Sequence, residues 1–170
     1  GPYGPETIYQ ENEMDLTRFV TQKNTEEGVW FEPVIFGTET GVEFLVIGAD
    51  SDTVRKHSSE TLREIQAMTK PQQERVNFVE RNRDAVVIRV KDIRGKDGNP
   101  IILDGAPVEN TSSGYRKIFE ACPEIQDAVK AFSDKRANFL PKEKTSSSEQ
   151  SDASSSSTIP TASDEGKIDK

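Results

Sequence analysis

Two stretches rich in β-branched and aromatic residues lie in the first third of the chain, at residues 29–36 and 42–47. Gly37 and Gly41 flank the short connection between them, a pattern that is typical of a β-hairpin. We therefore expect two antiparallel strands. Because Pro33 donates no backbone hydrogen bond, the first strand should lie at a sheet edge or be interrupted near its middle.

A helical period follows these strands, at residues 53–68. Asp50, Ser51 and Asp52 precede it and offer side chains that can cap its N-terminus. Apolar or small side chains recur every three or four positions, which predicts one face that packs on another element, the sheet being the nearest. The positions on this face are Val54, Ser58, Leu62, Ile65 and Met68.

Residues 73–93 fit two patterns. Val86, Ile88 and Val90 alternate as they would in a strand over residues 84–93. A helical period fits the longer window better, because side chains of one kind recur every three or four positions. We therefore predict one long helix over residues 73–92. The positions that carry this period are Val76, Val79, Arg83, Val86, Val90 and Ile93.

The second half of the chain predicts a small hairpin and two helices. Residues 101–103 and 106–108 flank an Asp-Gly turn, and residues 110–113 can cap a short helix. Pro123 suits the first turn of the next helix. The apolar stripe of the first helix comprises Tyr115, Ile118, Phe119 and Cys122, and that of the second comprises Ile125, Ala128, Val129, Phe132, Arg136 and Phe139.

These elements predict an α+β domain over residues 14–140, with a small N-terminal antiparallel hairpin or sheet packed with about four helices. Residues 1–13 are polar and open with a Gly-Pro pair that resembles a protease scar, so we expect a disordered leader or an expression-tag remnant. Residues 141–170 contain nine serines, no aromatic residue and only two large aliphatic residues. Such a segment cannot offset the entropy of ordering, so we expect a disordered serine-rich tail.

The net charge of −8 over 170 residues disfavours nucleic acid as a partner, because affinity for phosphates comes from Lys and Arg. No apolar run approaches the roughly 20 residues that cross a bilayer, and the first residues do not resemble a signal peptide. We therefore expect no membrane partner and a cytoplasmic location. The single cysteine, Cys122, offers neither an internal disulfide nor a thiolate metal site.

The sequence presents no pattern typical of catalysis. His57 is the only histidine and lies among Lys56, Ser58 and Ser59, so we expect it at the surface. Residues 48–52 resemble an acidic metal loop but lack the central glycine and distant glutamate of a calcium site, and helix capping explains them better. Phosphate-binding and C-x-x-C motifs are also missing. We expect no enzyme, and no catalytic, cofactor or metal site.

Three aromatic residues are candidates for contacts with a partner. Trp30 belongs to a residue type that is enriched at interface hot spots, although a single tryptophan in a strand is more often part of a core. Phe132 and Phe139, together with Phe119, could line a groove for a partner helix. In so small a domain most of this surface is also needed internally, so both interpretations stay open.

Several short segments together resemble the siphophage tail assembly chaperones. Residues 23–30, which read Lys-Asn-Thr-Glu-Glu-Gly-Val-Trp, are similar to the opening of that family, with a polar lead, an acidic pair, Gly-Val-Trp and a strand. Residues 93–101 resemble the end of a helix followed by its Asp-Gly-x-Pro turn. Similarity to the closing helix and its terminal Asn-Phe is found at residues 114–119, 123–129 and 137–140.

This resemblance implies a protein of the infected bacterium's cytoplasm that binds the tape measure protein, keeps it soluble and promotes polymerisation of the tail tube protein around it. Such a chaperone would be absent from the finished particle. An apolar groove within an acidic exterior suits a partner that exposes apolar helical faces. The alternative is a structural tail or head-tail connector subunit retained in the virion, which would self-assemble. The sequence leaves open whether the protein forms a homo-oligomer. It also leaves open whether a ribosomal frameshift produces a longer form, as in some members of that family.

Overall fold

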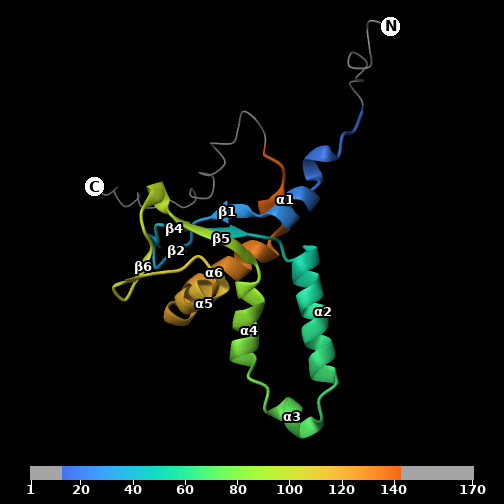
Figure 1. Cartoon of the computed structure of the whole chain (residues 1–170). Coiled ribbons are helices and arrows are strands. Elements are labelled where there is room, and N and C mark those ends of the chain that lie inside the picture. The colour runs from blue at the N-terminus through green and yellow to red at the C-terminus, as the bar shows by residue number, and fades with distance from the viewer. Residues whose placement is uncertain (1–12, 143–170) are drawn as a thin grey trace, which may run out of the picture. The chain divides into compact units, whose positions relative to one another are not determined.

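The computed structural model describes residues 13–142 (Figure 1). The expected leader and serine-rich tail lie outside the described residues, except for Glu13, Pro141 and Lys142. Helices and small antiparallel sheets combine in an α+β fold, as the sequence predicts. The short helices outside the main layers are η2 (Thr17–Phe19), α1 (Gln22–Glu27), η3 (Lys96–Gly98) and η4 (Arg136–Phe139).

A three-stranded antiparallel sheet has the order β1 (Val29–Phe31), β4 (Val42–Val46) and β5 (Val90–Gly95). The two strands expected from the hydrophobic pattern are therefore present, as β1 and β4. The expected interruption at Pro33 also occurs, because β1 ends before it and the chain then forms a hairpin of its own. This hairpin pairs β2 (Val34–Ile35) with β3 (Thr38–Glu39).

One face of the sheet packs on two helices, α5 (Ser112–Ala121) and α6 (Pro123–Asp134). Phe44 of β4 is fully buried there, and its ring lies 6.1 Å from that of Phe119, measured between centroids. Thr111 and Pro123 begin the two helices as the sequence predicts. The expected small hairpin, β6 (Ile102–Leu103) with β7 (Ala106–Pro107), precedes α5.

The prediction of one long helix over residues 73–92 is wrong. The structure has α3 (Lys70–Glu74), then α4 (Phe78–Val87), and then strand β5. Asn77 interrupts the helix because its side chain accepts a hydrogen bond from the Glu80 amide and so caps α4. Helix α4 ends at Val87, because the backbone N–H and C=O groups of the following residues form hydrogen bonds with β4 instead.

Helix α2 (Asp52–Gln66) begins at the predicted cap, Ser51, but it does not pack on the sheet as expected. Its principal neighbour is α4, and Val54 is its only buried residue. The predicted face is also rotated, because Ser58 and Leu62 are exposed. The residues on the less exposed side, which include the half-buried His57, are Val54, His57, Thr61, Ile65 and, beyond the helix, Met68.

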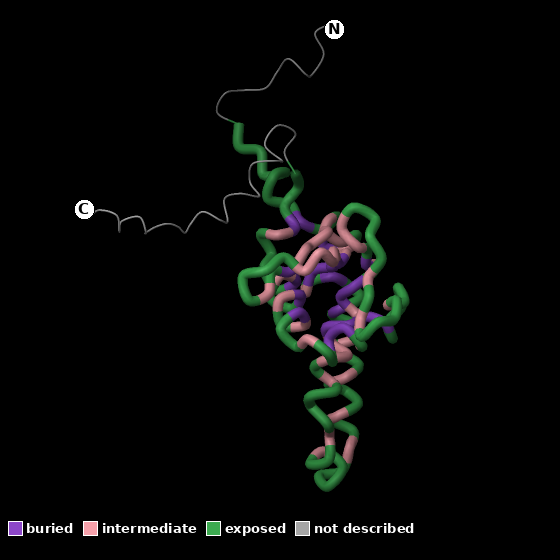
Figure 2. Tube along the Cα trace, turned by 90° about the vertical axis from the view of Figure 1, so that its left-hand side faces the viewer, coloured by how far each residue is buried: buried purple, intermediate pink, exposed green. Residues whose placement is uncertain are grey.

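We call residues 52–87, which form α2, α3 and α4, the helical arm. The arm projects from the body of the protein, with α3 at its tip (Figures 1 and 2). Buried residues gather in the body, whereas the outer part of the arm is exposed or half-buried (Figure 2). Buried apolar surface therefore stabilises the body, whereas much of the arm is exposed to solvent.

A buried polar cluster connects the end of α4 with α6. Arg89 is 8% exposed, and its Nη1 donates to Ser133 Oγ at 3.2 Å and to Asp134 Oδ1 at 2.7 Å. Ser133 Oγ in turn donates to the carbonyl of Ile47 at 2.7 Å. Burial by itself raises the pKa of Asp134, but hydrogen bonds from Lys130 and Arg89 outweigh it and hold the pKa below the ordinary value of 3.8.

Candidate protein-binding surfaces

Two of the three predicted contact residues lie together inside the protein. The Phe132 ring is stacked on Phe31, with 4.3 Å between centroids, and meets Phe139 edge-on at 5.7 Å. Phe139 is 1% exposed and Phe119 is fully buried, so neither ring is available to a partner in this conformation. Phe31 covers one face of the Phe132 ring, so that face is not open to a partner helix. Phe132 keeps partial exposure and stays a candidate.

Trp30 lies on the face of the sheet that points away from Phe132 and Phe139. It pairs with Leu45 in register, one residue away from the inward-facing pair of Phe31 and Phe44. The Arg94 guanidinium lies over the half-buried indole, 3.8 Å from its centroid, and also donates to Glu43 at 2.5 Å. This cation–π stack occupies one side of the ring, so the structure provides Trp30 with an intramolecular role.

The helical arm exposes large apolar side chains, two of which, Leu62 and Val79, lie on stripes that the sequence pattern predicted. Leu62 of α2 is 57% exposed, and on α4 Phe78 is 57% and Val79 64% exposed. A groove of about 640 Å³ lies between α2, α3 and α4, and none of these three side chains lines it. Its walls combine the apolar Met68 and Val76 with polar and charged groups: Glu64, Gln72, Arg75, Asn77, Glu80, Arg81 and Asp84.

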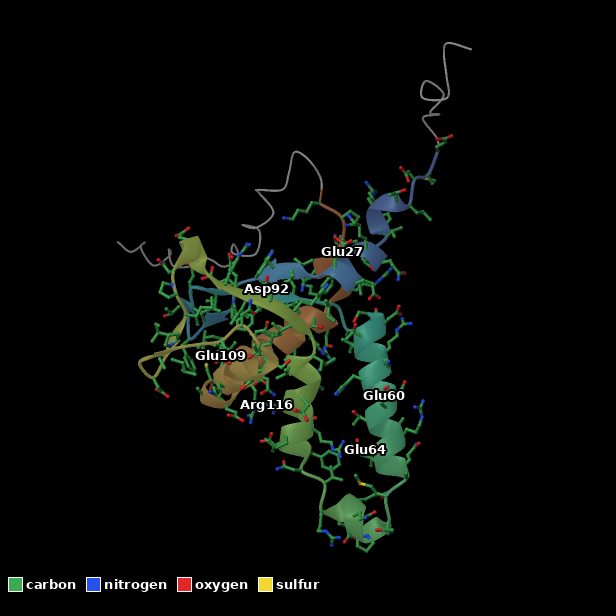
Figure 3. The ribbon with its side chains drawn as sticks, in the orientation of Figure 1. Glu27, Glu60, Glu64, Asp92, Glu109 and Arg116 are labelled. Atoms are coloured by element: carbon green, nitrogen blue, oxygen red, sulfur yellow. The ribbon has the colours of Figure 1, made fainter. Side chains whose placement is uncertain are left out.

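The arm has almost no core of its own, and polar contacts connect its helices with each other and with the body. Arg81 of α4 donates to both carboxylate oxygens of Glu64 on α2, at 3.0 and 3.2 Å, and these hydrogen bonds lower the pKa of Glu64. Arg116 of α5 pairs with Glu80 at 3.2 Å and with Asp84, which ties α4 to the body. Figure 3 labels Glu64 and Arg116, one end of each link. A bidentate pair sets the spacing of α2 and α4, although such exposed pairs add little stability.

The charge of the arm differs from that of the remaining chain. Seven basic and six acidic residues lie within residues 52–87, whereas the whole chain has a net charge of −8. Five of the basic side chains have no ion-pair partner among the described residues, so they can contact acidic groups of another molecule. These five are Arg55, Lys56, Arg63, Lys70 and Arg75.

A second exposed apolar feature is the turn of the β2–β3 hairpin. Phe36 is 85% exposed and has a φ of +53°, and Gly37 after it has a φ of +76°. Left-handed backbone conformation is uncommon for residues other than glycine, and a bulky residue there is strained. Val34 of β2 and Ile102 of β6 are also exposed, at 58% and 54%. Sequence patterns missed Phe36 because it extends an apolar run that reads as strand.

Within residues 13–142, no three His, Cys, Asp or Glu side chains come together as a metal site would require. No helix in the same range is long and apolar enough to span a bilayer.

Comparison with known proteins identified no matching family model, no similar curated protein and no similar solved structure.

Proposed function

We propose that this protein is a siphophage tail assembly chaperone of the host cytoplasm. It binds the tape measure protein through its helical arm, keeps that protein soluble and promotes polymerisation of the tail tube protein around it. The observation that carries the proposal is that the arm exposes three large apolar side chains, Leu62, Phe78 and Val79. The resemblance of residues 23–30, 93–101 and the closing helix to that chaperone family supports the same function.

The dimensions of the arm suit a helical partner. Helix α2 has 15 residues, which corresponds to about 22 Å of helix at roughly 1.5 Å per residue. A partner helix with an apolar stripe can lie along this length and cover side chains that the body leaves exposed. Its acidic flanking residues would meet the unpaired basic groups of the arm, such as Arg55 and Arg63.

Moderate affinity follows from the composition of this surface. Only three large apolar side chains are strongly exposed on the arm, and they stand among charged residues. Stable interfaces usually bury about 800 Å² per partner around a well-packed apolar centre. The arm has fewer such anchors, so the complex should dissociate readily. A chaperone needs this property, because growing tube subunits have to displace it.

The alternative function is a structural tail or head-tail connector subunit that stays in the virion. The exposed residues Val34, Phe36 and Ile102 of the two hairpins favour it, because exposed apolar side chains suit subunit contacts. This alternative predicts that the protein is present at high copy number in purified particles. A chaperone is absent from them, so mass spectrometry of virions separates the two functions.

Co-expression with the tape measure protein of the same phage tests the proposal. The chain should keep that partner in the soluble fraction, and a Leu62→Glu, Val79→Glu double variant should lose this ability, because the new carboxylates cannot be buried against an apolar stripe. Ile102→Glu is the matched control, since Ile102 is similarly exposed but lies outside the arm. Equal solubilisation by the double variant and the unmodified chain would contradict the proposal.

A further inference from the structure

The turn between β2 and β3 has the same backbone as a second turn in this chain. Ile35 pairs with Thr38, so Phe36 and Gly37 form a two-residue loop with φ angles of +53° and +76°. In the β6–β7 hairpin, Asp104 and Gly105 form a two-residue loop with φ angles of +52° and +81°. Positive φ at both positions is typical of a type I′ turn, where Asn-Gly and Asp-Gly are preferred.

Phe36 has no intramolecular reason to occupy its position. Asp104 fits the equivalent position, because a short polar side chain tolerates left-handed backbone. Phe36 has a strained backbone and an 85% exposed ring, so it gains almost no packing within its own chain. Strain that the fold does not require is a signal of function. The ring is therefore placed for a contact outside the chain.

The arm groove can accept such a ring. Its volume of about 640 Å³ lies within the range of roughly 300–1,000 Å³ that is usual for small-ligand sites, and one aromatic side chain is smaller than such ligands. Met68 and Val76 give it apolar walls, and both are half-buried. The β2–β3 hairpin belongs to the body, whereas the groove adjoins α3 at the tip of the arm (Figure 1). A chain cannot fill its own groove with Phe36 in this arrangement, but a second copy can.

The hairpin side of the sheet is acidic, and the groove has a basic group that no carboxylate of the described chain neutralises. Residues 29–46 carry three carboxylates and no basic side chain. Lys96 pairs with two of them, Glu32 at 3.2 Å and Glu39 at 3.3 Å, and one positive charge shared by two carboxylates leaves the hairpin negative. Three carboxylates line the groove, but each is paired with an arginine: Glu64 with Arg81, Glu80 with Arg83 and Arg116, and Asp84 with Arg116. Arg75 also lines the groove and has no ion-pair partner among residues 13–142, and Lys70 lies nearby in α3. Opposite charges favour the encounter of hairpin and groove.

We propose that Phe36 of one copy inserts into the arm groove of a second copy. Donor and acceptor are different surfaces of the same chain, so the contact is head-to-tail and each added copy offers both a free hairpin and a free groove. This self-association does not depend on the identity of the chaperone's partner.

Sedimentation velocity over a range of concentrations tests the inference. The unmodified chain should form a series of species that grows with concentration. Phe36→Asn should weaken this association at least about tenfold, because it removes the anchoring ring and keeps the turn. Asp104→Asn makes a matched change at the equivalent turn and should leave association unchanged. Circular dichroism confirms that each variant is folded.

A mixing experiment identifies the acceptor. Met68→Glu places a charge in the groove and should also give a monomer that still carries Phe36. A mixture of Phe36→Asn and Met68→Glu chains contains one intact groove and one intact ring, so it should form a one-to-one dimer and nothing larger. A mixture that stays monomeric contradicts the assignment, as does an unmodified chain that is monomeric at all concentrations.

These results are independent of the co-expression test. A chain that solubilises the tape measure protein but never self-associates contradicts only the Phe36 contact. A chain that assembles through Phe36 but leaves the tape measure protein insoluble contradicts only the chaperone function. The Phe36→Asn variant, whose arm is unchanged, should solubilise the tape measure protein as well as the unmodified chain does.

Discussion

Replacement of Phe36 by asparagine should make the protein more stable by about 0.5–1 kcal/mol. A non-glycine residue in left-handed conformation costs roughly 1–2 kcal/mol, and asparagine reduces this cost because its short side chain bonds locally. The opposing loss of burial is small. Full burial of such a side chain is worth roughly 1.5–3 kcal/mol, and with 85% of Phe36 exposed the loss is at most about 0.5 kcal/mol.

Urea unfolding followed by the fluorescence of Trp30 measures this change, because Trp30 is the only tryptophan and unfolding separates it from Arg94. The midpoint should rise by roughly 0.3–0.5 M for a slope of about 2 kcal/mol per M. Asp104→Asn should leave the midpoint nearly unchanged, because both residues suit that turn. A lower midpoint for Phe36→Asn would refute the strain argument, since it would mean that the ring contributes to the fold.

Three further predictions concern the body of the protein. Arg89→Met should lower the unfolding free energy by about 2 kcal/mol in urea titrations, because the buried Ser133 Oγ and the Asp134 carboxylate both lose the group that donates to them. The pKa of Asp134 in the folded protein lies below 3.8, so its ion pairs stabilise the fold above that pH. This stabilisation is lost as the pH falls through the lowered pKa. Asp134→Asn should therefore reduce the loss of stability that acid titrations measure below about pH 4. Gly114→Ala should lower the melting temperature despite the helix propensity of alanine, because the new Cβ would lie 1.8 Å from the Glu109 carbonyl oxygen. An unchanged or higher melting temperature would show that the start of α5 adapts freely.

Elements with strong local signals were predictable from the sequence. Glycine-flanked β-rich runs gave β1 and β4, Pro33 interrupted the first strand, and the polar residues Ser51 and Thr111 began their helices as expected. These outcomes depend on backbone chemistry within a few residues: a missing N–H at proline, or a side-chain oxygen that accepts from the first turn of a helix. The fold class follows from such local signals.

Strand β5 was not predictable in the same way. Val86 and Val87 belong to α4 and Val90 to β5, so one continuous apolar run spans two kinds of element. Both periods fit this run, and the decision comes from the free edge of β4, whose partner lies about fifty residues away in sequence. Tertiary pairing thus overrides a local helical period.

The candidate surfaces show the same limit. Phe132 and Phe139 lie on a predicted stripe, but the stripe alone does not reveal that Phe31 stacks on Phe132 or that Phe139 is buried. Two residues of the stripe predicted for α2, Ser58 and Leu62, are exposed, because the arm projects from the body and the helix turns another side inward. A positive φ at Phe36 has no sequence signal, because most bulky residues avoid it.

Hydrogen–deuterium exchange of the chain, alone and bound to the tape measure protein, tests most directly whether the arm is the site of partner binding. Backbone amides of residues 52–87 should become protected on binding, with little change at Trp30 or in the aromatic cluster of Phe31, Phe132 and Phe139. Protection confined to the sheet or to that cluster, with unchanged exchange along α2 and α4, would contradict the account.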